Sequence, residues 1–328
     1  MRPFAVLAAA TSIELCLAPA VVTAVGLGAA WSGWLDLVNA AAPLTVAVAG
    51  AGVLAARMAL PRGRTRTVCQ LAALAAAAAN LVVFGPGAAS APPAPAAGNL
   101  PTYRVVAANL YHENDMPFRA VGSVVARGAD AVLTLEADGT TEQAKALLMK
   151  AYPYQSVCGS GAVRIWLKRS ILAQGCGLPI RNGPAKWGKD FLWVRTTGPN
   201  GRPLVLAAVH LGRPYPPARQ DQERAMLAQV MAGGLSSPDT ILAGDFNTAP
   251  WTMAMIRQDR LLAGLRRLTG SQPTYPAENT LLRKAWPLPF LPIDHMYVGS
   301  HWRPVRIQRF RIIGSDHLGL EADLALSR

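Results

Sequence analysis

The sequence predicts an α/β protein in which two mixed β-sheets lie against flanking helices, preceded by a helical membrane region. Three observations lead to this fold class. Apolar runs rich in Ala, Val and Leu fill the first part of the 328-residue chain. After them, short β-rich apolar runs alternate with helical stretches, and strands outnumber helices. Several adjacent strands have no helix between them, which favours a mixed or antiparallel two-sheet arrangement over a doubly wound parallel sheet.

Three apolar runs open the chain, at residues 4–30, 38–60 and 68–84. A helix needs about 20 apolar residues to cross a hydrocarbon core of about 30 Å. The second run is long enough, and the third lies at the lower limit. The mean hydropathy of +0.22 is high for an ordinary soluble enzyme. We therefore predict a membrane region over residues 1–84 with about three transmembrane helices.

The charges of the loops predict the orientation of this region. Arg2 and the arginine-rich loop 57–66 belong inside, because positive loops stay in the cytoplasm. Trp31 and Trp34 then lie in the outer interfacial belt, and everything after Phe84 lies outside. The expected location is the inner (plasma) membrane, multi-pass, with an extracytoplasmic or periplasmic catalytic part. A cleaved signal peptide would explain only the first run.

One acid interrupts the first run. A charge at the centre of a membrane span costs about 2.5–3.5 kcal/mol on insertion scales. Either the span begins at Leu15 and leaves Glu14 at the inner interface, or Glu14 pairs within the bundle with Arg57 or Asn80. Neither alternative gives Glu14 a catalytic role.

Residues 85–101 form a Pro/Ala-rich linker that we expect to be extended, and the catalytic domain is expected to span residues 102–328. The net charge is +13, and the first hundred residues carry only five basic and two acidic groups, so about ten positive charges fall on the remainder. This favours polyanionic partners, either nucleic acid or the phosphate surface of a membrane, and does not choose between them.

Cys158 and Cys176 both lie in the part expected outside the membrane, where the compartment is oxidising. Their separation suits a disulfide between neighbouring strands, and two free buried thiols are the alternative. The four cysteines show no zinc spacing.

The elements of the catalytic part follow from two patterns. Runs of Val, Ile, Leu and aromatic residues bounded by turn formers predict strands, and longer stretches with apolar residues on one face predict helices. The predicted strands are 103–108, 131–135, 162–168, 191–196, 204–209, 240–243, 295–298, 306–312 and 320–324. The predicted helices are 118–127, 141–149 and 219–231.

Polar side chains stand abruptly at the ends of these strands. Ladder hydrogen bonds satisfy the strand backbone, so an acid there needs a functional explanation. Carboxylate, amide and imidazole groups can hold a divalent cation, orient water and contact a phosphate. The stretches Gly244-Asp245-Phe246-Asn247 and Ser315-Asp316-His317 carry the most specific signal. The full set is Asn109, Glu136, His210, Asp245, Asn247, Asp294, Asp316 and His317.

This ordered set resembles the endonuclease/exonuclease/phosphatase superfamily, which has a deoxyribonuclease I-like fold, and it is similar to the membrane-anchored bacterial type. The resemblance covers Thr102 to the C-terminus. It implies a four-layer α/β sandwich, with two central sheets between helices and the catalytic groups at one edge. It also implies dependence on Mg²⁺ or Mn²⁺.

The expected metal ligands are Asn109, Glu136 and Asp316, since hard oxygen donors suit Mg²⁺. Asn109 and Asp294 have the alternative of being turn residues, and Asp138 competes with Glu136 for the ligand role. His295 is expected to be structural because it should point to the face opposite Asp294.

The expected catalytic residues are His210, Asp245, Asn247, Asp294, Asp316 and His317. Either Asp245 or His317 serves as the base, the latter oriented by Asp316 or by a neighbouring strand-end acid. Asn247 donates to the phosphoryl oxygen as negative charge builds up. His210 is a second imidazole or a structural histidine, and Asp294 fixes its partner or the metal.

One loop near the site is not expected to take part in the reaction, and one expected acid is absent. His112, with Glu113 and Asp115, is expected to be a solvated loop rather than a substrate contact. Deoxyribonuclease-like members pair a second glutamate with their first catalytic histidine, and the stretch 154–168 contains no acid. Asp190 is the candidate substitute as partner of His210.

Three functions are compatible with these residues. The first is a phosphodiesterase or phosphatase directed at a lipid headgroup or a small molecule, favoured by the tether to the bilayer. The second is a nuclease acting on DNA or RNA, favoured by the positive charge. Trp251, Trp286, Arg283 and Lys284 are either contacts to a nucleic acid strand or the rim of a headgroup site. The third is a non-catalytic binding protein that keeps the fold, which the intact polar set disfavours. The sequence indicates no protein partner.

Overall fold

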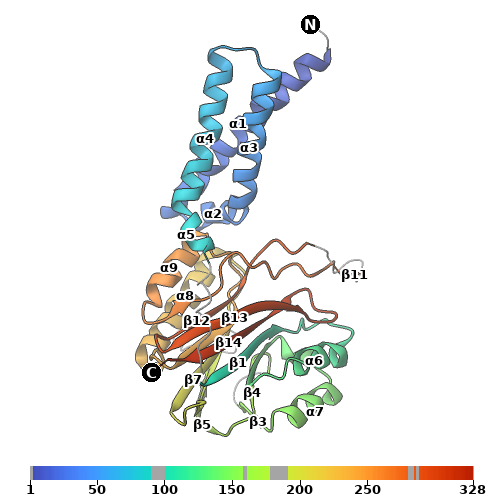
Figure 1. Cartoon of the computed structure of the whole chain (residues 1–328), viewed down its shortest axis with the longest axis vertical. Helices are drawn as coiled ribbons and strands as arrows, with labels where there is room; N and C mark the ends of the chain where they lie inside the picture. Colours follow the sequence, from blue (N-terminus) through green and yellow to red (C-terminus); the bar gives the residue numbers. More distant parts are fainter. Residues whose placement is uncertain are drawn as a thin grey trace. The chain divides into compact units, whose positions relative to one another are not determined.

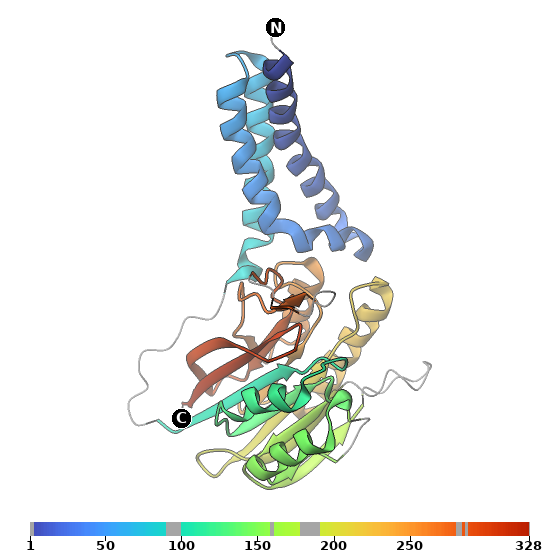
Figure 2. The ribbon, with the colours of Figure 1, turned by 90° about the vertical axis from the view of Figure 1, so that its right-hand side faces the viewer.

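The computed structural model describes residues 3–89, 100–157, 161–177, 191–279, 284–285 and 288–327. The chain divides into two compact units (Figures 1 and 2). The helical unit comprises Met1–Ala89 together with Ala249–Arg257. The sandwich unit comprises Ser90–Thr248 and Gln258–Arg328.

Three long helices build the helical unit, α1 (Pro3–Leu27), α3 (Ala42–Ala59) and α4 (Arg64–Val83). Each belongs to a segment long and apolar enough to cross a membrane. The short elements are η1 (Gly28–Ala30), α2 (Gly33–Asp36), η2 (Leu37–Ala41) and α5 (Gly85–Ala88). The predicted membrane-length helices are therefore present.

Small residues let these helices approach closely, as is usual where helices pack without a hydrophobic driving force between them. Ala49, Ala56 and Ala73 are buried between them with Cys16. A Cβ on Gly52 would lie 2.5 Å from the Leu15 carbonyl oxygen. Longer apolar side chains point outward, among them Leu7, Leu44, Leu71 and Val82. This distribution is typical of a bundle that faces lipid.

Polar groups within the bundle bond to one another. The Asn80 amide donates to Thr23 Oγ1 at 2.7 Å, and the Thr23 hydroxyl donates to the Pro19 carbonyl. Asn80 is thus engaged with Thr23 rather than with Glu14. Helix α1 begins well before Glu14, whose side chain is exposed.

The first sheet of the sandwich unit has six strands in the order β13-β14-β1-β2-β4-β3. The strands β1 and β2 are parallel, and the other neighbours are antiparallel. Their bounds are β1 Thr102–Asn109, β2 Ala131–Leu135, β3 Tyr154–Gln155, β4 Arg164–Leu167, β13 Trp302–Arg311 and β14 Leu318–Leu326.

The second sheet has six strands in the order β5-β6-β7-β8-β12-β9, and only β7 and β8 among these neighbours are parallel. Their bounds are β5 Ile171–Cys176, β6 Phe191–Thr197, β7 Pro203–His210, β8 Thr240–Asp245, β9 Arg266–Arg267 and β12 Asp294–Val298. A separate two-stranded hairpin pairs β10 (Glu278–Asn279) with β11 (Lys284–Ala285).

Alternation along β1 separates the two cores of the sandwich. Tyr103, Val105 and Ala107 belong to the core between the sheets, together with Leu206 and Ala243 of the second sheet. The intervening Val106 and Ala108 pack on the outer side against α6 and α7. These helices span Pro117–Val125 and Glu142–Ala151, and α8 (Pro217–Val230) lies on the opposite side of the sandwich (Figure 1). The predicted four-layer α/β sandwich is confirmed.

Some elements were not anticipated. Strand β5 and the short β3 and β9 were missed, as were η3 (Ala137–Gly139), η5 (Met231–Leu235) and helix α9 (Met253–Leu261). Helix α9 has weak amphipathic patterning, with Gln, Asp and Arg close together in its second half. Cys158 and Asp190 lie outside the described residues, so the disulfide and the role of Asp190 stay predictions; the same holds for the side chains of Arg283, Lys284 and Trp286.

The core between the sheets supports a stability prediction. Leu133 is fully buried at the centre of β2, opposite Ala107 and Ile165. Leu133→Ala should lower the free energy of unfolding by about 2–5 kcal/mol, because it leaves a cavity that the two sheets cannot close. Leu172→Ala removes the same atoms from a side chain that is 60% exposed and is the control. Thermal melting of both variants in detergent measures the difference, and equal melting temperatures would contradict this view of the core.

Candidate active site

Strand register places three of the predicted polar residues side by side in the second sheet. In the parallel pair β7–β8, His210 lies opposite Asp245. In the antiparallel pair β8–β12, Asp294 lies opposite Asp245. Residues opposite one another project from the same face of a sheet. An imidazole and two carboxylates therefore form one row across three strands.

The first sheet contributes the other groups. Asn109 ends β1 and lies opposite Leu135, and Glu136 follows directly. Ser315 holds the loop before β14, because its hydroxyl donates to the Asn109 carbonyl at 2.7 Å and accepts from the His317 amide at 3.0 Å. These bonds bring the Ser315-Asp316-His317 stretch to the end of β1.

The Asn109 side chain joins the two sheets. Its Nδ2 donates to Glu136 Oε1 at 2.9 Å and to Asp245 Oδ2 at 3.3 Å. His210 Nε2 lies 3.8 Å from Glu136 Oε1 and 3.7 Å from Asp245 Oδ2. Residues widely separated in the sequence thus converge at one rim of the sandwich.

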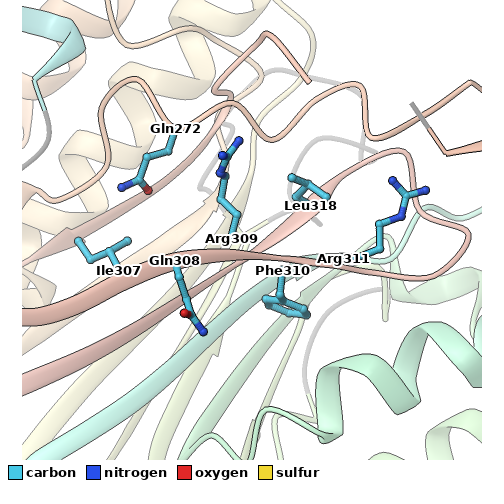
Figure 3. Close-up of a pocket in the computed structure, with 7 residues that line it drawn as sticks. All are labelled: Gln272, Ile307, Gln308, Arg309, Phe310, Arg311 and Leu318. Atoms are coloured by element: carbon cyan, nitrogen blue, oxygen red, sulfur yellow. The ribbon is translucent and has the colours of Figure 1, made fainter. Parts of the chain in front are cut away.

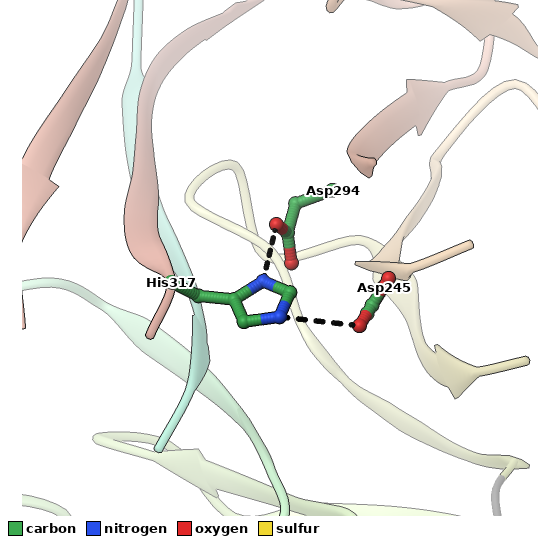
Figure 4. Close-up of side chains that lie close together, drawn as sticks. All are labelled: Asp245, Asp294 and His317. Carbon is green, nitrogen blue, oxygen red and sulfur yellow. Dashed lines mark hydrogen bonds and ion pairs between the residues drawn. The ribbon is translucent and has the colours of Figure 1, made fainter. Parts of the chain in front are cut away.

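His317 lies between two carboxylates (Figure 4). Its Nδ1 is 2.8 Å from Asp294 Oδ2 and its Nε2 is 3.7 Å from Asp245 Oδ2. Burial lowers the pKa of His317, but the negative charges of Asp294 and Asp245 outweigh it and raise the pKa to about 10. The sequence left two candidates for the acid that orients the His317 ring, Asp316 and a neighbouring strand-end acid. The ring is bonded to the strand-end acid Asp294 and not to Asp316.

The pKa values of the Asp245 and Glu136 carboxyl groups are shifted in opposite directions. Burial and the nearby charge of Asp294 raise the pKa of Asp245 to about 6, against the opposing effect of His317 and His210. Burial also raises the pKa of Glu136, but hydrogen bonds from His112 and Asn109 outweigh it and lower the pKa to about 2. Asp316 is half-buried, and this burial raises its pKa. Carboxyl groups at one site therefore differ in how readily they hold a proton, which suits them to different chemical roles.

The backbone around the site adopts conformations that ordinary residues avoid. Tyr111, Glu136 and Asn247 have φ values of 62°, 51° and 51°, and they are the non-glycine residues with positive φ among those described. Such conformations persist only where surrounding contacts hold them, and they cluster at functional sites. At Asn247, its amide donates to Asp245 Oδ1 at 2.7 Å and its side chain donates to the Leu211 carbonyl at 2.8 Å.

A close approach explains the glycine of the Gly-Asp-Phe-Asn stretch. Gly244 pairs with Val209 of the neighbouring parallel strand. A Cβ on Gly244 would lie 1.8 Å from the Val209 carbonyl oxygen. Any larger residue would push β8 away from β7 and displace Asp245 from His210.

Two residues near the site were set aside or overlooked in the sequence. His112 is exposed, as the prediction of a solvated loop requires, but its Nδ1 also lies 2.7 Å from Glu136 Oε2, and its amide donates to the same oxygen at 3.1 Å. Tyr275 stands with its ring against the imidazole of His317, the two centroids 5.1 Å apart. The proximity of His112 to the strand end at Asn109 was an available signal, whereas nothing local marks Tyr275. His295 is fully buried and bonded to Thr269 and Thr248, as a structural histidine should be.

The loop that carries Tyr275 is held on both sides by edge strand β13. Arg309 donates to the Pro273 carbonyl and Arg311 to the Ala277 carbonyl, so the two arginines bracket the tyrosine. Beside them is a pocket of about 430 Å³ (Figure 3). Its lining consists of Gln272, Ile307, Gln308, Arg309, Phe310, Arg311 and Leu318. Because Leu318 follows His317 directly, this pocket adjoins the start of β14, next in the chain to His317.

The donor set fits a divalent cation. Glu136 and Asp316 offer carboxylate oxygens and Asn109 an amide oxygen, the hard ligands that Mg²⁺ prefers. Asp245, Asp294 and His317 also have ligand atoms within 4.8 Å of one another. Both ring nitrogens of His317 face carboxylates, and its raised pKa favours an imidazolium, which cannot ligate a metal. Glu136, whose pKa is lowered to about 2, is ionised at neutral pH and is the candidate ligand for a cation.

Comparisons with known proteins agree with this geometry. The model of the Endonuclease/Exonuclease/phosphatase family matches residues 80–317. No curated protein sequence matches the chain significantly. The structural comparison finds the fold in several solved proteins.

An endonuclease/exonuclease/phosphatase from Beutenbergia cavernae is 18% identical with a TM-score of 0.53, over 69% of this chain and 72% of that one. TDP2 from D. rerio, complexed with a single-strand DNA product, is 18% identical with a TM-score of 0.52, over 68% and 98%. Sphingomyelinase C from Streptomyces griseocarneus is 15% identical with a TM-score of 0.50, over 68% and 99%. At these identities the likeness concerns the fold.

The family match spans most of the chain and includes every polar residue that converges at the rim. The chain therefore belongs to the endonuclease/exonuclease/phosphatase family and is a phosphoester hydrolase of the nuclease or phosphatase type.

Proposed function

We propose that this protein is a membrane-anchored, divalent-metal-dependent hydrolase that cleaves a phosphoester in a lipid headgroup. The observation that carries the hydrolase is the bridge from Asn109 to both Glu136 and Asp245, with the His317–Asp294 pair beside it. The proposed membrane attachment rests on the three membrane-length helices of the helical unit.

In the proposed reaction, Asp245 is the base. Its raised pKa of about 6 makes it a better proton acceptor than an ordinary aspartate, and it is ionised at neutral pH. A water molecule gives its proton to Asp245 while its oxygen forms a bond to phosphorus. The ester P–O bond breaks, and its electron pair leaves on the alcohol oxygen, which takes a proton from His210 or from solvent. The sequence leaves the base open between Asp245 and His317, and we propose Asp245.

His317 and its neighbours stabilise the charge that develops. An imidazolium held by Asp294 can donate from Nε2 to a phosphoryl oxygen. His210 is placed to donate to a phosphoryl or leaving oxygen. Asn247 Nδ2 contacts the Leu211 carbonyl with one hydrogen and has a second for the phosphate. Tyr275 covers one side of His317 and limits its access to water.

Glu136, Asn109 and Asp316 would hold Mg²⁺ or Mn²⁺. Such a cation neutralises phosphate charge and polarises the phosphoryl group when bound. Glu136 is held for this task by His112 and Asn109, which keep its carboxylate ionised.

The lipid headgroup is favoured as substrate because the predicted linker tethers the catalytic part to the bilayer, and because sphingomyelinase C has the same fold. A nuclease is the second candidate. It is favoured by the net charge of +13 and by the fold shared with TDP2, which was crystallised with a DNA product. We further propose the inner membrane as the location, with the sandwich unit outside the cytoplasm.

The first experiment assays the full-length protein in detergent with Mg²⁺. Its substrates are vesicles of sphingomyelin or glycerophospholipid, plasmid DNA and bis-p-nitrophenyl phosphate. We expect release of headgroups from the vesicles, and Asp245→Asn and His317→Ala should each lower kcat by about 10³-fold or more at nearly unchanged melting temperature.

The matched control is Asp239→Asn, because Asp239 also pairs with a histidine, His301, at 2.9 Å, outside the site. Retained activity in either site variant would overturn the mechanism. Cleavage of plasmid DNA without lipid hydrolysis would replace the lipid with nucleic acid as substrate.

The pKa values predict a bell-shaped pH profile of kcat/KM for bis-p-nitrophenyl phosphate. Activity should rise with pH as Asp245 loses its proton near pH 6, and fall as His317 loses its proton towards pH 10. Initial rates at constant Mg²⁺ and ionic strength measure both limbs. A rate that declines steadily from acidic to neutral pH would exclude Asp245 as the base.

Metal dependence has a readout besides activity. Excess EDTA should abolish hydrolysis, and added Mg²⁺ should restore it. Mg²⁺ should also raise the melting temperature, because a ligand that binds only the folded state stabilises it. Glu136→Gln should lose most of this rise, whereas Asp239→Asn should keep it. An equal rise in wild type and Glu136→Gln would place the cation elsewhere.

A further inference from the structure

The helical unit contains more than the three membrane-length helices. Residues Ala249–Arg257 belong to it, although they follow the sandwich strand β8 in the chain. Only Phe246, Asn247 and Thr248 separate this segment from the proposed base Asp245. The contacts that hold the segment are therefore of interest for the site.

The buried carboxylate of Asp36 is the centre of these contacts. Asp36 ends α2 and is 5% exposed. Its Oδ1 accepts from the Met253 amide at 2.9 Å, and its Oδ2 accepts from the Ala254 amide at 2.7 Å. Asn39 Nδ2 donates to Oδ1 at 2.7 Å and to the Gly26 carbonyl at 3.0 Å, which fixes the carboxylate against α1.

These two amides open helix α9, where backbone donors have no partner within the helix. The next donor, the Met255 amide, bonds to Thr252 Oγ1 at 3.2 Å. A side chain from the membrane bundle thus completes the cap that local residues begin. A carboxylate suits this position, because the start of a helix carries partial positive charge.

Packing around the cap is close. Trp251 is 5% exposed, donates from Nε1 to the Ala40 carbonyl at 3.3 Å, and forms an apolar cluster with Ala42 and Phe84. A Cβ on Gly87 would lie 2.2 Å from the Pro250 carbonyl oxygen. Only glycine permits this approach, so the segment is held by a hydrogen-bonded cap, an apolar cluster and a backbone contact.

We propose that the membrane bundle clamps the segment leaving the Asp245–Asn247 stretch, and that Asp36 is a positioning residue for the active site. The bundle is then part of the working enzyme and not only its anchor. The effect on turnover rests on the proposed hydrolase function, whereas the clamp itself does not. Release of Met253 and Ala254 frees the chain that continues from Asn247, whose left-handed backbone depends on its surroundings.

The experiment uses the full-length protein in detergent and compares Asp36→Ala, Asp36→Asn and Gly87→Val with wild type. Hydrogen exchange of peptides covering 249–261 reports the clamp directly. Asp36→Ala should speed exchange at Met253 and Ala254 by about tenfold or more, since it removes both acceptors. Asp36→Asn keeps one oxygen acceptor and should have an intermediate effect. Gly87→Val leaves the carboxylate intact and should release the segment by a second route.

Turnover of bis-p-nitrophenyl phosphate with Mg²⁺ reports the positioning role. Asp36→Ala should lower kcat by about fivefold or more with a smaller change in KM, and Asp36→Asn should restore part of the rate. The matched control is Glu14→Ala, which removes an exposed acid from α1 of the same unit and should change neither readout.

Each outcome discriminates. Unchanged exchange at Met253 and Ala254 in Asp36→Ala would overturn the clamp. Faster exchange with unchanged kcat would overturn the positioning role. Failure of wild type to hydrolyse any phosphoester would refute the proposed function and with it the positioning role, while exchange would still decide on the clamp.

Discussion

The crowding of acids at one rim is the constraint on which the rest of the site depends. Glu136, Asp245, Asp294 and Asp316 come from the ends of strands in two sheets. Burial and neighbouring acids raise the pKa values of Asp245 and Asp316, whereas hydrogen bonds from His112 and Asn109 outweigh burial and lower that of Glu136. Buried charges of one sign are unfavourable unless donors or opposite charges compensate them. The Asn109 amide and the imidazoles of His112, His210 and His317 supply that compensation, and a bound cation would complete it.

The negative charges of these acids are not compensated to the same extent, and the difference distinguishes Glu136 from Asp245. Glu136 accepts hydrogen bonds from two residues and stays ionised far below neutral pH. Asp245 is more deeply buried and faces Asp294, so it holds a proton more readily. Groups of the same chemistry are thereby suited to the two roles proposed for them, ligand and base, because their environments differ. The strained backbone at Glu136 and Asn247 indicates that the surrounding contacts enforce these positions.

The helical unit adds a second constraint. Its small residues allow close helix packing, and its outward Leu and Val side chains suit lipid. Asp36 is instead buried and bonded to backbone amides that open α9. A charged residue in such a place is unfavourable without partners, so its partners are informative about function. These partners lie in the segment of the helical unit that follows the proposed base along the chain.

The sequence by itself determined the fold class, the membrane-length helices and the identity of the polar groups at the strand ends. These follow from periodicity and from side chains next in sequence to a strand, which are local properties. The tertiary structure alone decided the partners: His317 with Asp294, Glu136 with His112, and Tyr275 against His317. It also decided the partners of Asp36 and the presence of α9, whose pattern is weakly amphipathic. These depend on strand register and burial, and residues from distant segments acquire their distances and pKa values only when the sheets have packed.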